Sequence, residues 1–368
     1  MTKSIRFVLL LSACALALAF GGNALAAYNP SLLVAGTSHS TGSGGPVVIG
    51  VGQDQNDDAT GVLNIYAPLG YGVTLTQAPG TRIGDLEAIV LVRALANARV
   101  PIQGTVTARD PGAYVNPQQF PCGGGVRHEA VWLIESTLAG NPLQIPIYVD
   151  RVTTGAEAQF ASAKMRICLA SPYVPPPQGA AAGASLIVAA FSVAGVFSNP
   201  NTRGTYPWNA LFVPYQPGTA TLNPANAAQS TSYTRLPVQL AVTAKKLKKK
   251  ARSKRRFARV TACVSEAGQP VRGVRVNILA GRTARRTGRV AFGRTNSRGC
   301  LVRTIRLRYR TTFIRASTSV PERDVTSAPG CTPPLSAAPG QLPPARCTSA
   351  TLAPALSLFS RNTARVRR

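Results

Sequence analysis

Short apolar runs bounded by glycine and proline recur along the whole sequence, and they constrain the fold more than any other feature. In several runs, such as residues 62–66 and 164–168, apolar and polar residues alternate. Alternation with a period of two is typical of a strand that buries one face. The 368 residues include 33 Gly and 29 Pro, a content that favours many turns and disfavours long helices. We therefore predict an all-β protein.

In the first part of the chain, the runs follow one another at the spacing of an antiparallel sandwich, which we assign to residues 27–244. Segment 85–98 also fits a helix, but Val90, Val92 and Val100 favour a strand. The predicted strands are 46–51, 61–66, 72–75, 88–92, 104–108, 130–134, 143–149, 163–169, 186–196 and 236–242.

Residues 245–256, KKLKKKARSKRR, divide the chain by charge. Residues 28–244 hold ten Lys or Arg and ten Asp or Glu, whereas residues 245–368 hold twenty-nine and three. A dense block of like charges repels itself and stays solvated. We therefore predict a basic linker at 245–256 between a neutral domain and a strongly cationic second part.

The second part also has a strand pattern. The predicted strands are 259–264, 269–278, 288–292, 295–302, 305–309 and 312–317. In two of them apolar residues alternate with arginines, which predicts a sheet with one packed and one cationic face.

Three features of this part form a recognisable set: G-x-P-V-x-G-V-x-V at 268–276, T-N-S-R-G at 295–299, and a closing strand near Ser317. The set resembles the bacterial immunoglobulin-like repeats of surface adhesins and the prealbumin-like modules of some secreted enzymes. The resemblance covers 257–320 and implies an immunoglobulin-like β-sandwich without catalytic residues. Residues 321–368 are then predicted to be a Pro-rich, disulfide-closed tail of irregular backbone.

The first 26 residues have the three parts of a secretory signal. Lys3 and Arg6 precede an apolar run at 7–20, and Ala24-Leu25-Ala26 supplies small residues for cleavage. The run is too short to span a membrane. A lipoprotein cleavage site at Cys14 is the alternative. We expect a secreted, extracellular protein associated with the bacterial cell surface.

An exported chain with an even number of cysteines is expected to form disulfides. The neutral part, the basic strands and the tail each contain two, so we predict sequential pairing. A zinc site is the competing interpretation, but the short C-x(2-4)-C spacing is absent. Apart from Cys14 in the predicted signal peptide, the chain has six cysteines, Cys122, Cys168, Cys263, Cys300, Cys331 and Cys347.

Candidate catalytic residues are few. His128-Glu129 begins like a zinc-protease helix but lacks the second histidine, and no G-x-S-x-G motif occurs. A Ser-His-Asp arrangement built on His128 stays open because triads assemble in space. A secreted hydrolase with an accessory immunoglobulin-like module is therefore the alternative function.

Two other groups of residues are candidate sites. Asp54, Asn56 and Asp58 match the first three ligands of a calcium loop, but the turn glycine and the final glutamate are missing. They are a weak calcium candidate, with a solvated turn as the other interpretation. The aromatic residues around Trp208 fit either an exposed binding surface or core. No cofactor is expected.

The charge points to anionic partners. We predict a secreted, non-enzymatic structural or adhesion protein whose cationic half binds anionic cell-envelope polymers or polysaccharide through counterion release. Specific nucleic-acid recognition is not expected, because no recognition motif is present. The expected polyanion-binding residues are Lys245, Lys246, Lys248, Lys249, Lys250, Arg252, Lys254, Arg255, Arg256, Arg306, Arg308 and Arg310.

Overall fold

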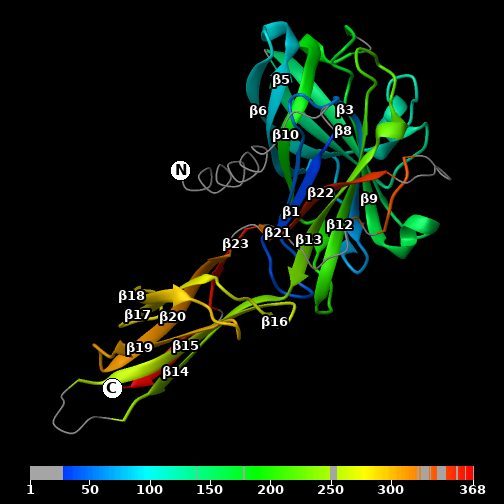
Figure 1. The fold of residues 1–368 in the computed structure, drawn as a ribbon. Coiled ribbons are helices and arrows are strands. Elements are labelled where there is room, and N and C mark those ends of the chain that lie inside the picture. Colours follow the sequence, from blue (N-terminus) through cyan, green and yellow to red (C-terminus); the bar gives the residue numbers. More distant parts are fainter. Residues whose placement is uncertain are drawn as a thin grey trace.

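The computed structural model describes most of the chain after the predicted signal peptide (1–26), which lies outside the described residues. The described residues are 28–138, 140–176, 179–248, 255–320, 323–324, 331, 333–337, 345–353, 355–360 and 362–367. They form two β-domains, and the second extends from one end of the first (Figure 1). The all-β prediction is confirmed. Within the described chain, no helix is long and apolar enough to cross a membrane.

The first domain contains β1 to β13 together with two strands from the C-terminal part of the chain. Its strands are β1 (Ser31–Gly36), β2 (Val47–Gly52), β3 (Thr60–Pro68), β4 (Gly72–Val73), β5 (Arg82–Val92), β6 (Ala98–Arg109), β7 (Ala130–Leu138), β8 (Asn141–Arg151), β9 (Ala161–Cys168), β10 (Ala184–Val193), β11 (Phe197–Ser198), β12 (Gly204–Pro214), β13 (Ala228–Leu236), β21 (Arg323–Asp324) and β22 (Arg346–Ala353). Segment 85–98 is therefore mainly strand, as its valines indicated. Short 3-10 helices lie in the connections, namely η1 (Arg93–Leu95), η2 (Pro111–Tyr114), η3 (Pro121–Gly123), η4 (Ala156–Gln159), η5 (Ala181–Gly183) and η6 (Pro224–Asn226).

Thirteen of these strands form one sheet, in the order β1-β2-β10-β5-β6-β7-β8-β9-β3-β12-β13-β22-β21. The sheet curls so that β1 returns to β13. There the Leu32 N–H donates to Ser230 Oγ (3.0 Å) and the Val34 N–H donates to Ser232 Oγ (2.9 Å). These bonds give the edge of β1 partners that a neighbouring strand would otherwise supply.

The inward faces of the curled sheet enclose an apolar core that includes Trp132 and Trp208, both fully buried. Tyr71 and Phe197 pack edge-on against Trp208, with ring centroids 5.1 and 5.2 Å away. The aromatic group around Trp208 therefore belongs to the core, in a strand, β12, that the sequence interpretation missed.

The second domain is a sandwich of two sheets. One contains β14 (Val238–Lys246), β15 (Phe257–Glu266), β16 (Gln269–Pro270) and β19 (Cys300–Arg306), and the other β17 (Arg275–Gly281), β18 (Thr287–Arg294), β20 (Thr311–Val320), β23 (Leu356–Phe359) and β24 (Ala364–Arg367). Alternate residues such as Val260, Ile278 and Ile314 fill the space between the sheets. In the T-N-S-R-G turn, Asn296 Oδ1 accepts the Arg298 and Cys300 N–H groups, both at 3.0 Å, and Gly299 has a φ of 70°. That backbone conformation favours glycine.

The predicted boundary after residue 244 and the predicted linker at 245–256 are wrong in the described parts. The two cores divide between Leu236 and Val238. Strand β14 pairs with β15 from Val238↔Glu266 to Lys246↔Ala258, so the basic run connects two paired strands of one sheet. Local charge density gave no sign of this pairing, because the partner strand lies on the far side of the run.

The predicted unit at 257–320 is likewise incomplete, and the irregular tail at 321–368 is wrong in part. β22 runs parallel to β13 in the first domain, while β23 and β24 pair with β20 in the second. The chain therefore passes between the domains three times, between β13 and β14, between β20 and β21, and between β22 and β23.

The cysteines pair sequentially, as predicted, in the disulfides Cys122–Cys168, Cys263–Cys300 and Cys331–Cys347. The first joins η3 to β9, the second joins β15 to β19, and the third anchors β22. Three intrachain disulfides are typical of proteins that fold in an oxidising compartment.

Candidate anionic-polymer interface

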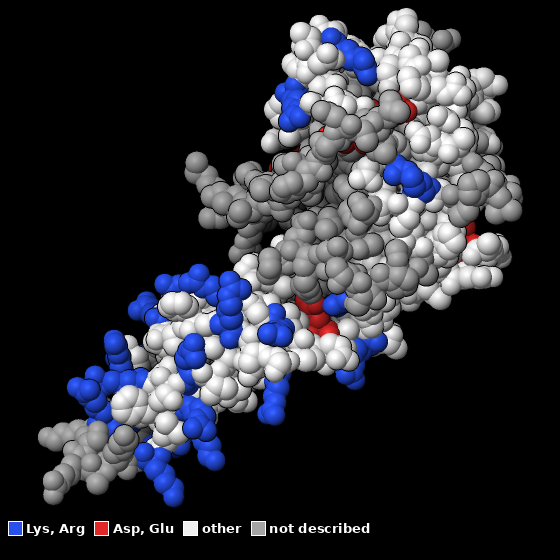
Figure 2. All heavy atoms as spheres, in the orientation of Figure 1, with Lys and Arg blue, Asp and Glu red and all other residues white. Residues whose placement is uncertain are grey.

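Positive charge gathers on the second domain, as Figure 2 shows by the blue side chains over its surface. From residue 238 to residue 320 the sequence contains one acidic residue, Glu266. That side chain is buried, and its Oε2 lies 4.0 Å from Arg235 of the first domain. Within this part of the chain the arginines have almost no acid to neutralise them, so the surface keeps a strong positive field.

On the outward side of the β17–β20 sheet, strand register aligns aromatic and cationic side chains in rows that also contain other residues. Strand register places Phe292 of β18, Asn277 of β17, Ser317 of β20 and Phe359 of β23 in one row across four strands. The next row contains Arg289 of β18 and Arg315 of β20, with Leu279 of β17 between them. Aromatic and cationic rows thus follow each other along the strands, about 7 Å apart for two residues of rise.

Arginines stack on the aromatic rings of this surface. Arg275 and Arg289 lie over Phe292, with Cζ 4.9 and 5.6 Å from the ring centroid. The same contact joins Arg315 to Phe359 and Arg365 to Phe313, both at 5.7 Å. We name the set Arg275, Arg289, Arg315, Arg365, Phe292, Phe313 and Phe359 the Arg–Phe face.

The rings of the Arg–Phe face are not core residues, since Phe292 is 55% exposed and Phe359 is 61% exposed. A stacked guanidinium keeps its N–H donors free for carboxylate, sulfate or phosphate oxygens. A planar or ring-shaped unit of a polymer gains from stacking on an exposed ring. The arrangement is therefore suited to a repeating anion that also carries flat or ring-shaped units.

The cations predicted from sequence converge at one end of the same domain. Lys245 faces Arg259 across β14 and β15, and Arg306 faces Phe257 across β19 and β15. The Leu307 N–H donates to the Arg256 carbonyl (2.8 Å), which brings Arg308 to this end as well. We name Lys245, Lys246, Arg256, Arg306 and Arg308 the cationic tip.

The other residues predicted to bind polyanions differ in whether the structure describes them. Lys248, Arg255 and Arg310 are described and exposed, whereas Lys249, Lys250, Arg252 and Lys254 lie outside the described residues. The expected alternation of buried and exposed residues continues to Leu307 and then ends. Tyr309, the next residue expected to be buried, is 41% exposed in the turn before β20.

Sequence reasoning missed the Arg–Phe face. The alternation at 274–278 placed Arg275 outward, but nothing local to that strand identified the aromatic residues of β18 and β23 as its neighbours. Phe359 in particular comes from the part of the chain that was predicted to be an irregular tail. The available signal was the outward spacing of Phe313 and Arg315, two residues apart in one strand.

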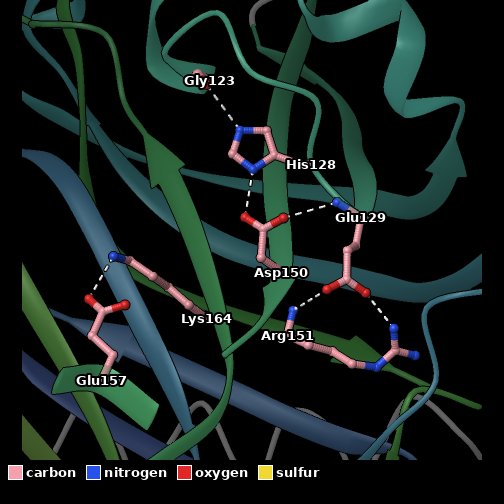
Figure 3. Close-up of polar contacts among 7 residues, drawn as sticks. All are labelled: Gly123, His128, Glu129, Asp150, Arg151, Glu157 and Lys164. Carbon is pink, nitrogen blue, oxygen red and sulfur yellow. Dashed lines mark hydrogen bonds and ion pairs between the residues drawn. The ribbon is translucent and has the colours of Figure 1, made fainter. Parts of the chain in front are cut away.

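His128 lies in a hydrogen-bonded network that occupies both of its ring nitrogens (Figure 3). Nδ1 lies 2.7 Å from Asp150 Oδ2, and Nε2 lies 3.0 Å from the Gly123 carbonyl oxygen. Asp150 also accepts the Glu129 N–H, and Glu129 pairs with Arg151. Because a general base needs an available nitrogen, this geometry gives no support to the triad on His128.

Tyr148 packs against the His128 ring with ring centroids 4.8 Å apart, and burial raises the pKa of Tyr148 to about 12. The phenol therefore stays protonated at neutral pH. The contacts of His128 thus hold η3, and with it the Cys122–Cys168 disulfide, against β7 and β8. This is the arrangement of a structural histidine beside a cross-linked turn.

The weak calcium candidate is an internally bonded turn. Asp54 Oδ1 accepts the backbone N–H (2.9 Å) and the side-chain amide (3.0 Å) of Asn56. Asp57, which the motif did not include, accepts the Asn29 N–H (2.9 Å), and burial raises its pKa. Asp58 Oδ2 lies 3.5 Å from the Asn226 amide. Within the described chain, no three His, Cys, Asp or Glu side chains are grouped closely enough to hold a metal ion.

These features define an all-β, disulfide-bonded chain of two interlaced domains, the second of which is basic. No protein-family model matches the sequence, and no curated protein matches it. Among solved structures, the full-length major pilin SpaD from Corynebacterium diphtheriae matches at 9% identity over 78% of this chain and 56% of the pilin, with a TM-score of 0.25. The D2 and D3 domains of the same pilin match at 8% identity, 78% and 81% coverage, and a TM-score of 0.20. At these scores the similarity to pilin domains carries no functional argument.

Proposed function

We propose that this chain is a secreted structural or adhesion protein of the bacterial cell surface whose second domain binds anionic envelope polymers or acidic polysaccharide. The observation that carries the proposal is the Arg–Phe face, where four arginines and three partly or largely exposed phenylalanines follow strand register. The cationic tip extends the positive surface to the end of the domain.

Physical chemistry favours a polymer over a small anion. A chain that neutralises several arginines at once releases several counterions, so affinity grows with the number of repeats engaged. Stacking on the exposed rings adds a contribution to the binding free energy that salt does not screen. This contribution distinguishes the Arg–Phe face from a merely charged surface.

The test is binding of the disulfide-intact protein to fluorescently labelled polyuronate and polyphosphate, measured by anisotropy between about 50 and 400 mM salt. On nucleic acids the slope of log K against log salt is about −0.7 to −0.9 per neutralised charge. Replacing Arg275, Arg289, Arg315 and Arg365 by Gln is therefore expected to make the slope shallower by about 3.

A matched control removes the same charge elsewhere in the second domain. Arg282, Arg285, Arg286 and Arg298 are exposed in its connections and belong to neither named surface. Their fourfold replacement by Gln is expected to change the slope much less. Equal weakening by the two variants would mean that net charge alone drives association, and would contradict a built interface. Wild-type binding unaffected by salt would contradict the whole proposal.

A further inference from the structure

The first domain contains a feature that the proposed function does not use, an apolar cavity of about 570 Å³. It lies within the curled sheet, between residues of β5 to β8 on one side and of β2, β3, β9 and β10 on the other. Side chains such as Ile102, Ile134, Ile167 and Phe191 form its walls. None of the described residues that line it is charged. Interiors are normally packed to crystal density, so a void of this size in a domain core needs an explanation.

Small residues at facing positions create the void. Ala88 of β5 and Ala189 of β10 are direct partners across the two strands, and both line the cavity. Ala180, Ala181 and Ala184 line it at the end nearer η5. Equivalent inward positions of neighbouring strands carry larger residues, such as Ile102 and Ile134, which would fill the space if repeated here.

The cavity reaches the surface, since its lining includes the exposed residues Pro142, Gln144, Ala170 and Ala181. Just inside this rim, Leu143, Ile145 and Leu186 are only partly buried. Partly exposed aliphatic side chains around an apolar opening lower their free energy when hydrocarbon covers them.

Thr60, the buried polar side chain among the described lining residues, already has hydrogen-bond partners. The Thr60 hydroxyl donates to Gln53 Oε1 (2.5 Å) and also lies 2.7 Å from the Tyr28 hydroxyl. A polar headgroup buried there would lose its hydration without gaining partners. The buried part of any ligand must therefore be hydrocarbon, with its polar end at the rim beside Gln144.

We propose that this cavity binds the aliphatic chain of a lipid-like molecule. Its volume is roughly four times the ~150 Å³ of an apolar cavity that admits benzene, which matches an extended chain better than a single small ring. The proposal is independent of the polymer-binding function, because it concerns a different domain and an uncharged ligand segment.

The chain-length dependence of binding is a sharp expectation. Each methylene transferred from water into the cavity is expected to tighten binding roughly fourfold until the cavity is full. The test uses the intact protein and cis-parinaric acid, whose fluorescence rises in apolar surroundings, displaced by decanol, dodecanol and tetradecanol. Displacement that does not improve with chain length would overturn the proposal.

Whether binding depends on a charged headgroup is tested with the methyl ester of the same probe. It is expected to bind within a few-fold of the acid, because none of the described residues that line the cavity is charged. Binding of the acid but not of the ester would place recognition on the carboxylate and would refute the assignment to the chain.

Two variants separate a real cavity from a packed core. Ala88→Leu together with Ala189→Leu is expected to reduce probe affinity at least tenfold while leaving the melting temperature unchanged or higher, since the added groups enter empty space. Ala210→Leu is the control, because Ala210 is fully buried in the same core but does not line the cavity. It is expected to lower the melting temperature by overpacking and to leave probe binding intact.

If the double variant melts as low as the control, the void is not present in solution and the proposal fails. Undiminished probe binding by a stably folded double variant would also overturn it, because the probe would then bind elsewhere.

Discussion

Cleaving the chain within the basic run tests how the two domains are joined. For this experiment, a site for a sequence-specific protease is inserted between residues 250 and 251, and the protein is cleaved there without denaturant. If the basic run were a linker between two independent domains, the cut would release a neutral fragment and a basic fragment. The structure predicts instead that both fragments stay in one complex, because β14 remains in the neutral fragment while β15, its partner, begins the basic one.

The free-energy cost of separating the two fragments follows from the apolar side chains that separation would expose. β14 contributes Val238, Leu240 and Val242 to the core of the second domain, all buried. At about 1.5–3 kcal/mol for each buried aliphatic side chain, withdrawing the strand costs roughly 5–9 kcal/mol before its hydrogen bonds are counted. That is comparable to the whole stability of a small domain, about 5–15 kcal/mol.

The assay is size-exclusion chromatography of the cleaved, non-reduced protein at micromolar concentration, with the uncleaved protein as the reference. Co-elution of the two fragments at the uncleaved volume, and their separation only in denaturant, is the expected result. Two separate peaks in native buffer would refute the pairing of β14 with β15 as a stabilising contact.

Three further predictions concern single sites. Burial raises the pKa of the Asp57 carboxyl, so the folded chain holds the carboxyl proton more tightly than the unfolded chain. The free energy of unfolding therefore falls as pH rises from the unfolded-state pKa of Asp57 through its folded-state pKa. Asp57→Asn should raise the urea midpoint at pH 7 and match the wild type at pH 3. His128→Ala removes the bonds to Asp150 and to the Gly123 carbonyl, and should lower the free energy of unfolding by about 1–3 kcal/mol in chemical denaturation; an unchanged midpoint would show that the network is not structural. Replacing Cys263 and Cys300 by Ser opens a loop closed over 37 residues, and calorimetry should show a loss of about 3–4 kcal/mol.

Much of the fold could be read from local pattern. Alternation with a period of two identifies the strands because each buries one face, as in β9, where Met165 and Ile167 are buried and Lys164 and Arg166 are less so. Disulfide pairing followed from the distribution of cysteines among three regions. Alternation is a short-range signal and the distribution of cysteines a regional one; strands such as β9 and the three disulfides are confirmed.

Partner choice between distant strands could not be read in the same way. Residues 238–246 have a clear strand pattern, but nothing within them states whether they extend the sheet before them or begin the one after. The break lies at Leu236 and Pro237, and only the packing of Val238 against the second core decides it. The Pro-rich content of the tail likewise concealed β22, β23 and β24, whose pairing depends on strands far upstream.

The Arg–Phe face shows the same limit at the level of the candidate site. Phe292, Arg315 and Phe359 come from strands separated by dozens of residues and become neighbours only through register. Composition indicated a cationic surface, and the prediction placed most of it on the densest charge run. Sheet geometry adds a second, more ordered surface that charge counting does not detect.

The distribution of ion pairs separates the roles of charge in the two domains. In the first domain, charges meet opposite charges, as in Arg109 with Glu135 and Lys164 with Glu157. In the second, Lys245 faces Arg259 and Arg275 faces Arg294 across paired strands, arrangements that destabilise a sheet. Folding gains nothing from such repulsion, and the three chain crossings and the Cys263–Cys300 disulfide must hold the domain against it. Under the proposed function, a polyanion bound to the second domain would relieve this repulsion directly.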